Sequence, residues 1–215
     1  TQDTNSYYIC NQVTALGIEV TRITTIPDNL ETITLTLRES ISRKPDFIIT
    51  TGGLGSTYDD MTIKSLAKAL NQPLEINQEL LKDLETKFNL IYQIGKAKHK
   101  EMTEERIKIA YVPKGSQTFL NPVGLAPATL VQIKETKIIT LPGFPQEVKA
   151  LFEKHLTPLI KKTVKNQYAE EHIITQGLIE SDLSPLIETK KSPQKYTSQH
   201  EEKTQTYTSK LLKKN

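Results

Sequence analysis

The sequence predicts an α/β fold with a mostly parallel sheet that helices cover on both faces. Strand-like and helix-like segments alternate along the chain, which is the order that parallel sheets require. Two strand-like segments run directly into glycine-containing loops that open helices. With 215 residues, 36% of them apolar, the chain can build one main domain and a smaller unit. We therefore expect a main domain over residues 1–165 and a small α+β appendage over residues 166–215.

The elements of the first half follow from apolar periodicity, β-branched runs and capping residues. We first expect a helix that carries Tyr8, Ile9, Val13 and Leu16 and ends at Gly17, followed by a strand over Ile18–Ile26. Next come a helix that carries Ile33, Leu37 and Ile41 and a strand over Phe47–Thr51. Two further helices are marked by Ile63 to Leu70 and by Leu80 to Phe88. Asp3-Thr4-Asn5 and Pro27-Asp28-Asn29 supply the N-cap candidates for the first two helices.

The second half begins with residues 92–106, which carry no apolar stripe and predict an exposed excursion. Thr129–Ile133 and Lys137–Leu141 predict paired strands, and Pro142 to Pro145 open a helix. Beyond Lys165 we expect a strand over His172–Leu178, a helix near Asp182 to Ile187 and then polar residues without a further element.

Composition excludes several classes of protein. A net charge of +3 is too small to indicate nucleic-acid binding. The sequence has no apolar run of the roughly 20 residues that a membrane span needs. We also expect no signal peptide, because the sequence does not open with a basic and then apolar stretch. Cys10 is the single cysteine, so no intrachain disulfide can form. We expect a cytoplasmic protein without nucleic-acid or membrane partners, and the histidines show no zinc-site spacing.

The glycine-rich loop after Phe47–Thr51 predicts a phosphate site. Three glycines within four positions let backbone N–H groups approach an anion, and the next helix begins there. The second strand-glycine-helix junction should face the same crevice, because ligands bind at the carboxyl ends of parallel strands. The candidate phosphate- or nucleotide-binding residues are Thr51, Gly52, Gly53, Gly55, Ser56, Pro142 and Gly143.

Asp59 and Asp60 follow the glycines directly. Two carboxylates would repel a phosphate unless they bind a divalent cation or act on the substrate. Asp28, at another strand-to-helix turn, is a third candidate for the crevice. We therefore take Asp60, Asp59 and Asp28 as catalytic candidates, and Asp60 and Asp59 as metal ligands. The alternative for each aspartate is N-capping of the helix that follows it.

A second loop, Asn121-Pro122-Val123-Gly124-Leu125-Ala126-Pro127, is rigid and carries little apolar bulk. Loops of this kind often position ligands. An ordinary turn between two strands is an equally good interpretation.

Three motifs in this order, TTGGLGSTYDDMT, NPVGLAP and LPGFPQE, resemble the molybdopterin-binding-like (MoCF biosynthesis) domain of the CinA, or competence- and damage-inducible, proteins. The resemblance covers roughly residues 1–165 and implies a three-layer fold. Related molybdenum-cofactor enzymes favour T-G-G-T-G followed by Arg-Asp, so Leu54 and the Asp59-Asp60 pair favour the CinA branch. The segment from His172 is similar to part of the small middle domain of CinA proteins.

The chain departs from that family in two respects. CinA-like chains usually begin with a strand followed by G-[ND]-E-L-L-x-G, which is not found before Asp3-Thr4-Asn5. We therefore expect that the first strand has been truncated or omitted. Nothing resembles the carboxy-terminal nicotinamide-mononucleotide deamidase domain of bacterial CinA, so we expect no deamidase activity.

The resemblance implies a nucleotide or pterin ligand. For the CinA branch it implies hydrolysis of a nucleotide pyrophosphate such as ADP-ribose, with a divalent metal (Mg²⁺, Mn²⁺ or Co²⁺) and with potassium as a further candidate ion. Asp60 is the first catalytic candidate, and a homodimer is expected. The alternatives are molybdopterin adenylylation or other handling of the molybdenum cofactor, and a regulatory module that binds its ligand without turnover.

Overall fold

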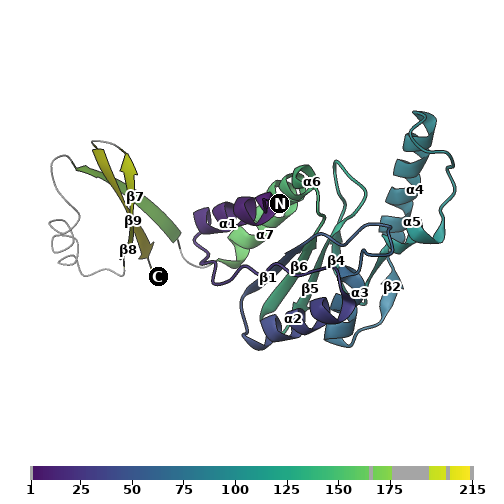
Figure 1. The fold of residues 1–215 in the computed structure, drawn as a ribbon, viewed down its shortest axis with the longest axis horizontal. Coiled ribbons are helices and arrows are strands. Elements are labelled where there is room, and N and C mark those ends of the chain that lie inside the picture. The colour runs from purple at the N-terminus through teal and green to yellow at the C-terminus, as the bar shows by residue number, and fades with distance from the viewer. Residues whose placement is uncertain (1, 165–166, 176–193, 202–203, 214–215) are drawn as a thin grey trace. The chain divides into compact units, whose positions relative to one another are not determined.

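The computed structural model describes residues 2–164, 167–175, 194–201 and 204–213 (Figure 1). By their contacts the residues divide into two compact units. The first comprises Thr1–Tyr8 and Arg22–Pro158, and the second comprises Ile9–Thr21 and Leu159–Asn215. The division into domains over 1–165 and 166–215 stays a prediction.

A four-stranded mixed sheet forms the centre of the first unit. Its strands lie in the order β1 (Phe47–Thr51), β6 (Thr136–Leu141), β5 (Ala128–Ile133) and β4 (Gln117–Phe119). β1 and β6 are parallel, whereas β5 and β4 extend the sheet with antiparallel pairings. The predicted α/β fold class and the predicted pairing of the two strands around residue 135 are confirmed.

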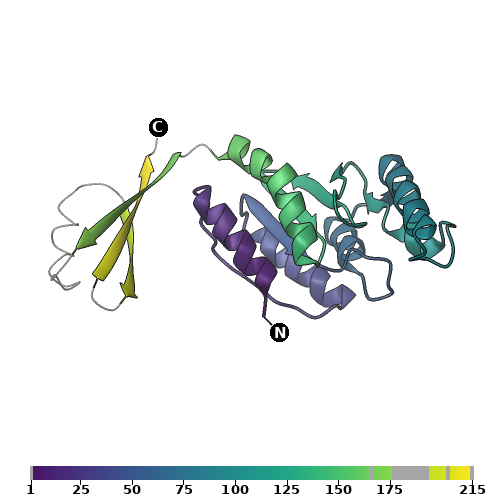
Figure 2. The same ribbon diagram turned by 90° about the horizontal axis from the view of Figure 1, so that it is seen from above.

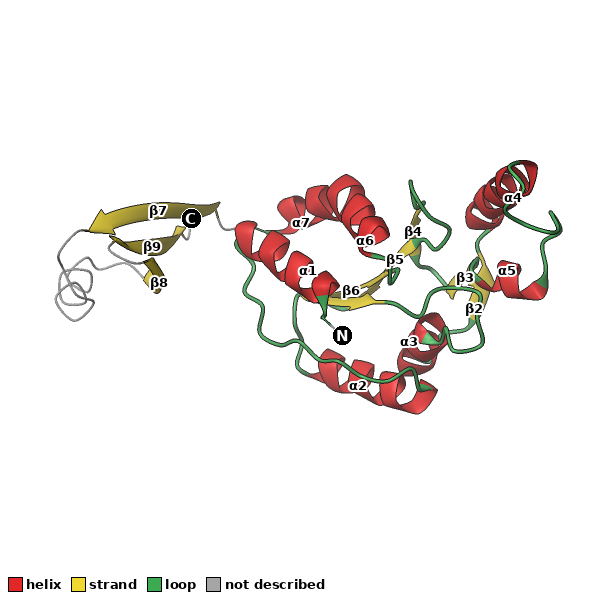
Figure 3. Ribbon diagram, turned by 45° about the horizontal axis from the view of Figure 1, so that its top comes forward, coloured by secondary structure: helices red, strands yellow, loops and turns green. Residues whose placement is uncertain are grey.

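Helices cover both faces of this sheet (Figure 3). α2 (Leu30–Ser42) and α3 (Thr62–Leu70) lie on one face, and α6 (Pro145–Leu151) lies on the other. The chain continues from α6 through the π-helical turn η1 (Phe152–Leu156) into α7 (Thr157–Thr163). One apolar cluster joins α2 and α3 to the sheet through Ile33, Leu37, Leu66, Val131 and Ile138. No helix among the described residues is long and apolar enough to cross a membrane.

The remaining elements of the first unit build a lobe beside α3. They are β2 (Leu74–Ile76), α4 (Gln78–Gln93), α5 (Glu104–Lys108) and β3 (Tyr111–Pro113). β2 and β3 pair antiparallel. The apolar cluster of this lobe includes Leu80, Leu84, Phe88, Ile109, Ala110 and Val112.

Two loop residues are buried in this same lobe cluster. Leu54 of the glycine loop is 6% exposed, and Ala126 of the 121–127 loop is 8% exposed. Each loses water contact by packing against α4 and β3 rather than against the central sheet. The lobe therefore holds both loops in position.

α1 (Thr4–Ala15) has the predicted start and end signals. Hydrogen bonds from the Ser6 side chain and from the Ser6 N–H, the latter at 2.9 Å to Asp3 Oδ1, lower the pKa of Asp3. Gly17 adopts φ +83° after the last turn. Tyr8 joins the start of α1 to η1. Its ring meets the Phe152 ring edge-on at 5.9 Å. The start of α1, in purple, lies next to the N label in Figure 2.

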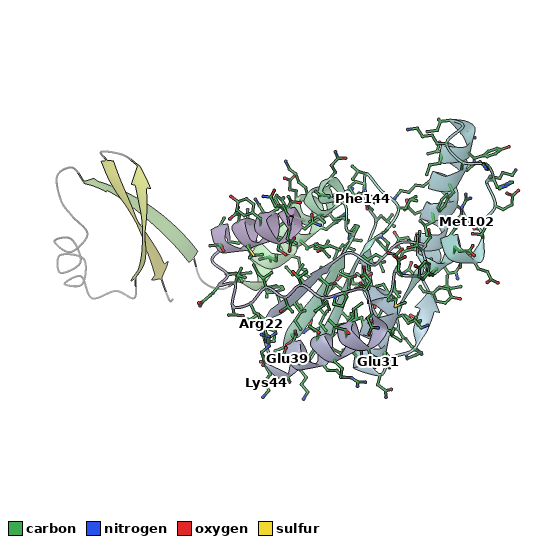
Figure 4. All side chains as sticks on the ribbon, viewed as in Figure 1. Arg22, Glu31, Glu39, Lys44, Met102 and Phe144 are labelled. Atoms are coloured by element: carbon green, nitrogen blue, oxygen red, sulfur yellow. The ribbon has the colours of Figure 1, made fainter. Side chains whose placement is uncertain are left out.

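The predicted strand over Ile18–Ile26 is wrong, because these residues form no regular element. The segment is largely exposed, with Ile23 57% accessible. Arg22 lies against Glu39 of α2 in Figure 4, and the Arg22 Nη1 to Glu39 Oε1 distance is 3.1 Å. β-Branched residues favour an extended backbone, but a strand also needs a neighbouring strand to pair its backbone groups. The alternating pattern does not show whether such a neighbouring strand exists.

The second unit contains a three-stranded antiparallel sheet in the order β7 (Gln167–Thr175), β9 (Thr204–Lys213) and β8 (Gln194–Glu201). β7 overlaps the predicted strand over His172–Leu178, whose last three residues lie outside the described ones. The predicted helix near 182–187 also lies outside them. β8 and β9 form where no element was predicted, because backbone pairing stabilises strands whose Thr, Ser and Gln side chains give a weak apolar pattern.

Candidate functional site

The two strand-glycine-helix junctions meet at one edge of the central sheet. Thr51 pairs in register with Leu141, and the Gly52 N–H donates to the Leu141 carbonyl at 2.9 Å. A Cβ built on Gly143 would lie 3.5 Å from the Gly52 Cα. The Asn5 Nδ2 group donates to the Gly143 carbonyl at 2.8 Å. The structure therefore brings the glycine loop and the Pro142-Gly143 turn together, as parallel neighbouring strands require.

The glycine loop folds back onto the start of α3. Gly52 and Gly53 have φ values of +92° and +68°, which only glycine adopts without strain. The Thr62 N–H donates to the Gly53 carbonyl at 3.1 Å, and Thr62 Oγ1 donates to the Gly52 carbonyl at 2.8 Å. Met61 occupies the N-cap position and no side chain caps the helix, so neither Asp59 nor Asp60 has the capping role considered above. The positive end of α3 faces the loop without a side-chain capping oxygen.

Both aspartates of the loop converge on the Thr57 hydroxyl. Asp60 Oδ2 accepts from Thr57 Oγ1 at 2.7 Å and from the Thr57 N–H at 2.9 Å, while Asp59 Oδ1 contacts the same hydroxyl. Burial acts to raise the pKa of Asp60, but four other interactions lower it and outweigh burial. They are hydrogen bonds from the Thr57 side chain, the Gly55 N–H and the Thr57 N–H, and the nearby charge of Lys108. The pKa of Asp60 is therefore lowered, and its carboxylate is ionised at neutral pH.

A lysine from a distant part of the chain completes the loop. Lys108 is the last residue of α5, and its Nζ donates to the Thr57 carbonyl. The sequence did not single out Lys108, because nothing in its local sequence distinguishes it from the other surface lysines. Lys64, in the first turn of α3, is a second lysine beside the loop that the sequence did not single out.

A cavity of about 290 Å³ opens beside this loop. Its lining residues come from the glycine loop, α3, the lobe and the start of β5, and they are Gly53, Leu54, Gly55, Asp60, Ile63, Lys64, Leu74, Lys108, Ile109, Tyr111, Pro127 and Thr129. One part of the lining is polar and charged, and the rest is apolar with one tyrosine. Ligand sites typically combine such a mostly apolar wall with a few polar groups.

The predicted site residues divide into two groups. Gly53, Gly55 and Asp60 line the cavity. The candidates that do not line it are Thr51, Gly52, Ser56, Asp59, Pro142, Gly143 and Asp28. All of these except Asp28 belong to the two junctions that meet at the sheet edge. Asp28 is exposed before α2, where the Asn29 Oδ1 atom caps the helix by accepting from the Thr32 N–H at 3.0 Å.

The 121–127 loop is organised by the side chain of Asn121, which is 1% exposed. Its Oδ1 accepts from the N–H groups of Val123 at 3.0 Å and Gly124 at 2.9 Å. Its Nδ2 donates to the Ala126 carbonyl at 2.8 Å and to Glu147 Oε2 at 2.7 Å. All four hydrogen bonds shape the loop that carries Pro127 to the wall of the cavity.

Glu147, in the first turn of α6, is the charged partner of this loop. Burial raises the pKa of Glu147, and the hydrogen bond from Asn121 and the charge of Lys87 only partly oppose that rise. Lys87 donates to the Asn121 carbonyl at 2.7 Å, which ties α4 to the same loop. Phe144, just before α6, is 72% exposed (Figure 4).

The donors for a metal ion are few. Among the described residues no three His, Cys, Asp or Glu side chains group together as a metal site would require. Asp59 and Asp60, which meet at Thr57, are the oxygen donors beside the cavity. Such a pair fits a cation of the Mg²⁺ type, which binds through one or two carboxylates and completes its shell with phosphate oxygens and water.

The sequence and the fold match known proteins. The family model described as "Probable molybdopterin binding domain" matches residues 1–162. A protein of Caldivirga maquilingensis is 39% identical over 187 residues, covering 87% of this chain and 69% of the relative. A protein of Pyrococcus furiosus is 39% identical over 190 residues, covering 87% of this chain and 73% of the relative.

The crystal structure of the protein CinA with unknown function from Thermoplasma acidophilum is similar to this chain, with a TM-score of 0.65 and 32% identity. The match covers 74% of this chain and 89% of that one. The chain therefore belongs to the family of molybdopterin binding domains and is a CinA-like member of it.

Proposed function

We propose that this protein binds a phosphorylated heterocyclic compound, a pterin or a nucleotide, in the cavity beside the glycine loop. The observation that carries the proposal is that one cavity is lined both by glycine-loop backbone with charged side chains and by apolar side chains. The membership of the molybdopterin-binding family supports binding of such a ligand ahead of hydrolysis. The protein would then act in handling a pterin cofactor or as a binding module.

The polar end suits a phosphate. Gly53 and Gly55 present backbone at the cavity, and the start of α3, which no side chain caps, adds partial positive charge. Lys64 and Lys108 supply two full positive charges on the same wall. The ionised Asp60 carboxylate offsets one of these charges, so the charged side chains of the lining keep one net positive charge. This charge and the glycine-loop N–H groups would together favour a bound phosphate.

The apolar wall suits a flat ring. Leu54, Ile63, Ile109 and Pro127 provide aliphatic surface, and Tyr111 provides an aromatic ring. Burial of a planar heterocycle against such a wall removes apolar area from water on both partners. The wall lies in the same cavity as the phosphate end, so one ligand can contact both.

Replacing Lys108 with methionine is expected to weaken binding of guanosine monophosphate by about tenfold or more, because a charge-assisted hydrogen bond contributes roughly 1.5–3 kcal/mol. Methionine keeps the length of the side chain but removes the charge. The measurement is isothermal titration calorimetry of the variant and the unmodified chain. Lys98→Met, which changes an exposed lysine outside the cavity, is the matched control. Equal affinities for the Lys108 variant and the control would exclude this phosphate site.

Metal-dependent hydrolysis of a pyrophosphate such as that of ADP-ribose is the second candidate function. The observation in its favour is that Asp59 and Asp60 meet at one hydroxyl beside the cavity. A bound divalent ion would supply charge for the departing phosphate. Asp60 would hold the ion and orient a water molecule whose oxygen attacks phosphorus as the bridging P–O bond breaks.

Hydrolysis would convert ADP-ribose and water to AMP and ribose 5-phosphate. Chromatography after incubation with Mg²⁺, Mn²⁺ or Co²⁺ should then show both products, and Asp60→Asn should lower the rate about a hundredfold or more. Asp28→Asn is the informative control, because Asp28 lies outside the cavity lining and its loss should leave the rate unchanged. Ligand binding without any product, with every metal, would leave binding alone as the function.

A further inference from the structure

Three threonines form a row across the central sheet, and the one on β1, Thr50, lies two residues before the glycine loop. Thr50 of β1 pairs in register with Thr140 of β6, and Thr140 pairs with Thr129 of β5. Side chains at directly paired positions point to the same face of a sheet. Val131, two residues after Thr129, packs with Leu66 of α3, so the row faces α2 and α3. This is the face from which the cavity opens.

The hydroxyl oxygens of all three threonines are buried, and none has a hydrogen-bond partner. Thr129 and Thr140 are each 0% exposed. A buried hydroxyl without a partner is costly, and native structures seldom retain one without a reason. Of the three, only a hydroxyl that borders a cavity can gain its missing partner from a bound ligand.

Thr129 is the member of the row that lines the cavity. It follows Pro127 by two residues, so it belongs to the wall on which the ring of a ligand would rest. Threonine occupies discrete staggered χ1 wells, and a change of well places the hydroxyl where a methyl group or hydrogen had been. A ligand in the cavity would thus meet the hydroxyl after a change of χ1 together with a small shift of the side chains that cover Thr129, which is 0% exposed.

We propose that the Thr129 hydroxyl hydrogen-bonds the polar edge of the bound heterocycle and makes Thr129 a specificity-determining residue. The inference rests on the proposed binding function, and it assigns the ring, rather than the phosphate, to the β5 side of the cavity. A hydroxyl can both donate and accept, so it suits the ring nitrogens and the amino or oxo groups of a purine or pterin. Sites that hydrogen-bond a polar substrate group discriminate strongly against compounds that lack it.

The test compares two probes that share a phosphate and differ in the ring. Guanosine monophosphate carries a guanine, whose pyrimidine edge has the same amino and oxo substituents as a pterin, and ribose 5-phosphate carries no heterocycle. Calorimetry should show that Thr129→Val weakens guanosine monophosphate binding roughly 5- to 10-fold and leaves ribose 5-phosphate within about twofold. Thr129→Ser, which keeps a hydroxyl, should restore most of the lost affinity.

Thr140→Val is the matched control, because Thr140 has the same burial and the same unpartnered hydroxyl but does not line the cavity. It should leave both affinities unchanged. An unchanged affinity of Thr129→Val for guanosine monophosphate, an equal loss for both probes, or an equal loss in Thr140→Val would each overturn the role of Thr129. If neither probe binds the unmodified chain, the proposed function itself fails, so the two failures are distinct.

Discussion

Replacing Asn121 with alanine is expected to lower the free energy of unfolding by about 3–5 kcal/mol, because the substitution leaves several buried groups without partners. The amide accepts from two loop N–H groups and donates to the Ala126 carbonyl and the Glu147 carboxylate. With the side chain 1% exposed, water cannot replace these hydrogen bonds without opening the loop. Urea denaturation of the purified variant measures the loss.

Asn77→Ala is the matched control for this substitution. Asn77 caps α4, where its Oδ1 accepts from the Leu80 N–H at 3.0 Å, and loss of such a cap costs about 1 kcal/mol. The Asn121 variant should therefore be clearly less stable than the Asn77 variant. Equal losses would show that the 121–127 loop keeps its shape without its central amide.

Gly53→Ala is expected to destabilise the chain by about 2–4 kcal/mol, since strain at positive φ and a steric clash act together. Gly53 has φ +68°, and a Cβ there would lie 2.3 Å from Thr62 Oγ1. Relief of the clash would break the hydrogen bond from Thr62 to the Gly52 carbonyl. The free energy of unfolding, measured in urea, should fall accordingly.

Gly52→Ala separates the two causes. Gly52 also has a positive φ, +92°, but nothing lies within 4 Å of an added Cβ, so only the strain of about 1–2 kcal/mol applies. A double-mutant cycle with Thr62→Ala should recover about 1 kcal/mol or more of the Gly53→Ala loss, because the clashing oxygen is removed. Additive losses in that cycle would contradict the steric explanation.

The parts of the fold that the sequence predicted are those that local patterns determine. The strand over Phe47–Thr51, the helix that Pro145 opens and the end of α1 at Gly17 each depend on residues within one turn or strand. The segment Ile18–Ile26 has an equally good local pattern but forms no strand. Pairing depends on residues far along the chain, and a single strand-like pattern does not reveal whether a partner exists.

The same distinction applies to the candidate site. Gly53, Gly55 and Asp60 stand in one motif, so the sequence identified the loop that lines the cavity. Lys108 also lines the cavity, although it lies 51 residues after Thr57 in the sequence. Thr129 lines it too, and it lies about 70 residues after Asp59. No local sequence pattern predicts that these distant residues meet the loop. The question of whether Asp59 or Asp60 caps α3 also required the structure, because a cap and a ligand-binding carboxylate have the same sequence signature.

The burial of Leu54 and Ala126 in the α4 lobe has a consequence for how the ligand could change among relatives. Leu54 and Pro127, the neighbour of Ala126, both line the cavity, and the cluster that holds Leu54 and Ala126 also contains Leu84, a residue 1% exposed and absent from the cavity lining. A change of side-chain volume at Leu84 would therefore shift Leu54 and Pro127 relative to each other. The size of ring that the cavity accepts can thus be adjusted by repacking one helix, while every residue that contacts the ligand stays the same.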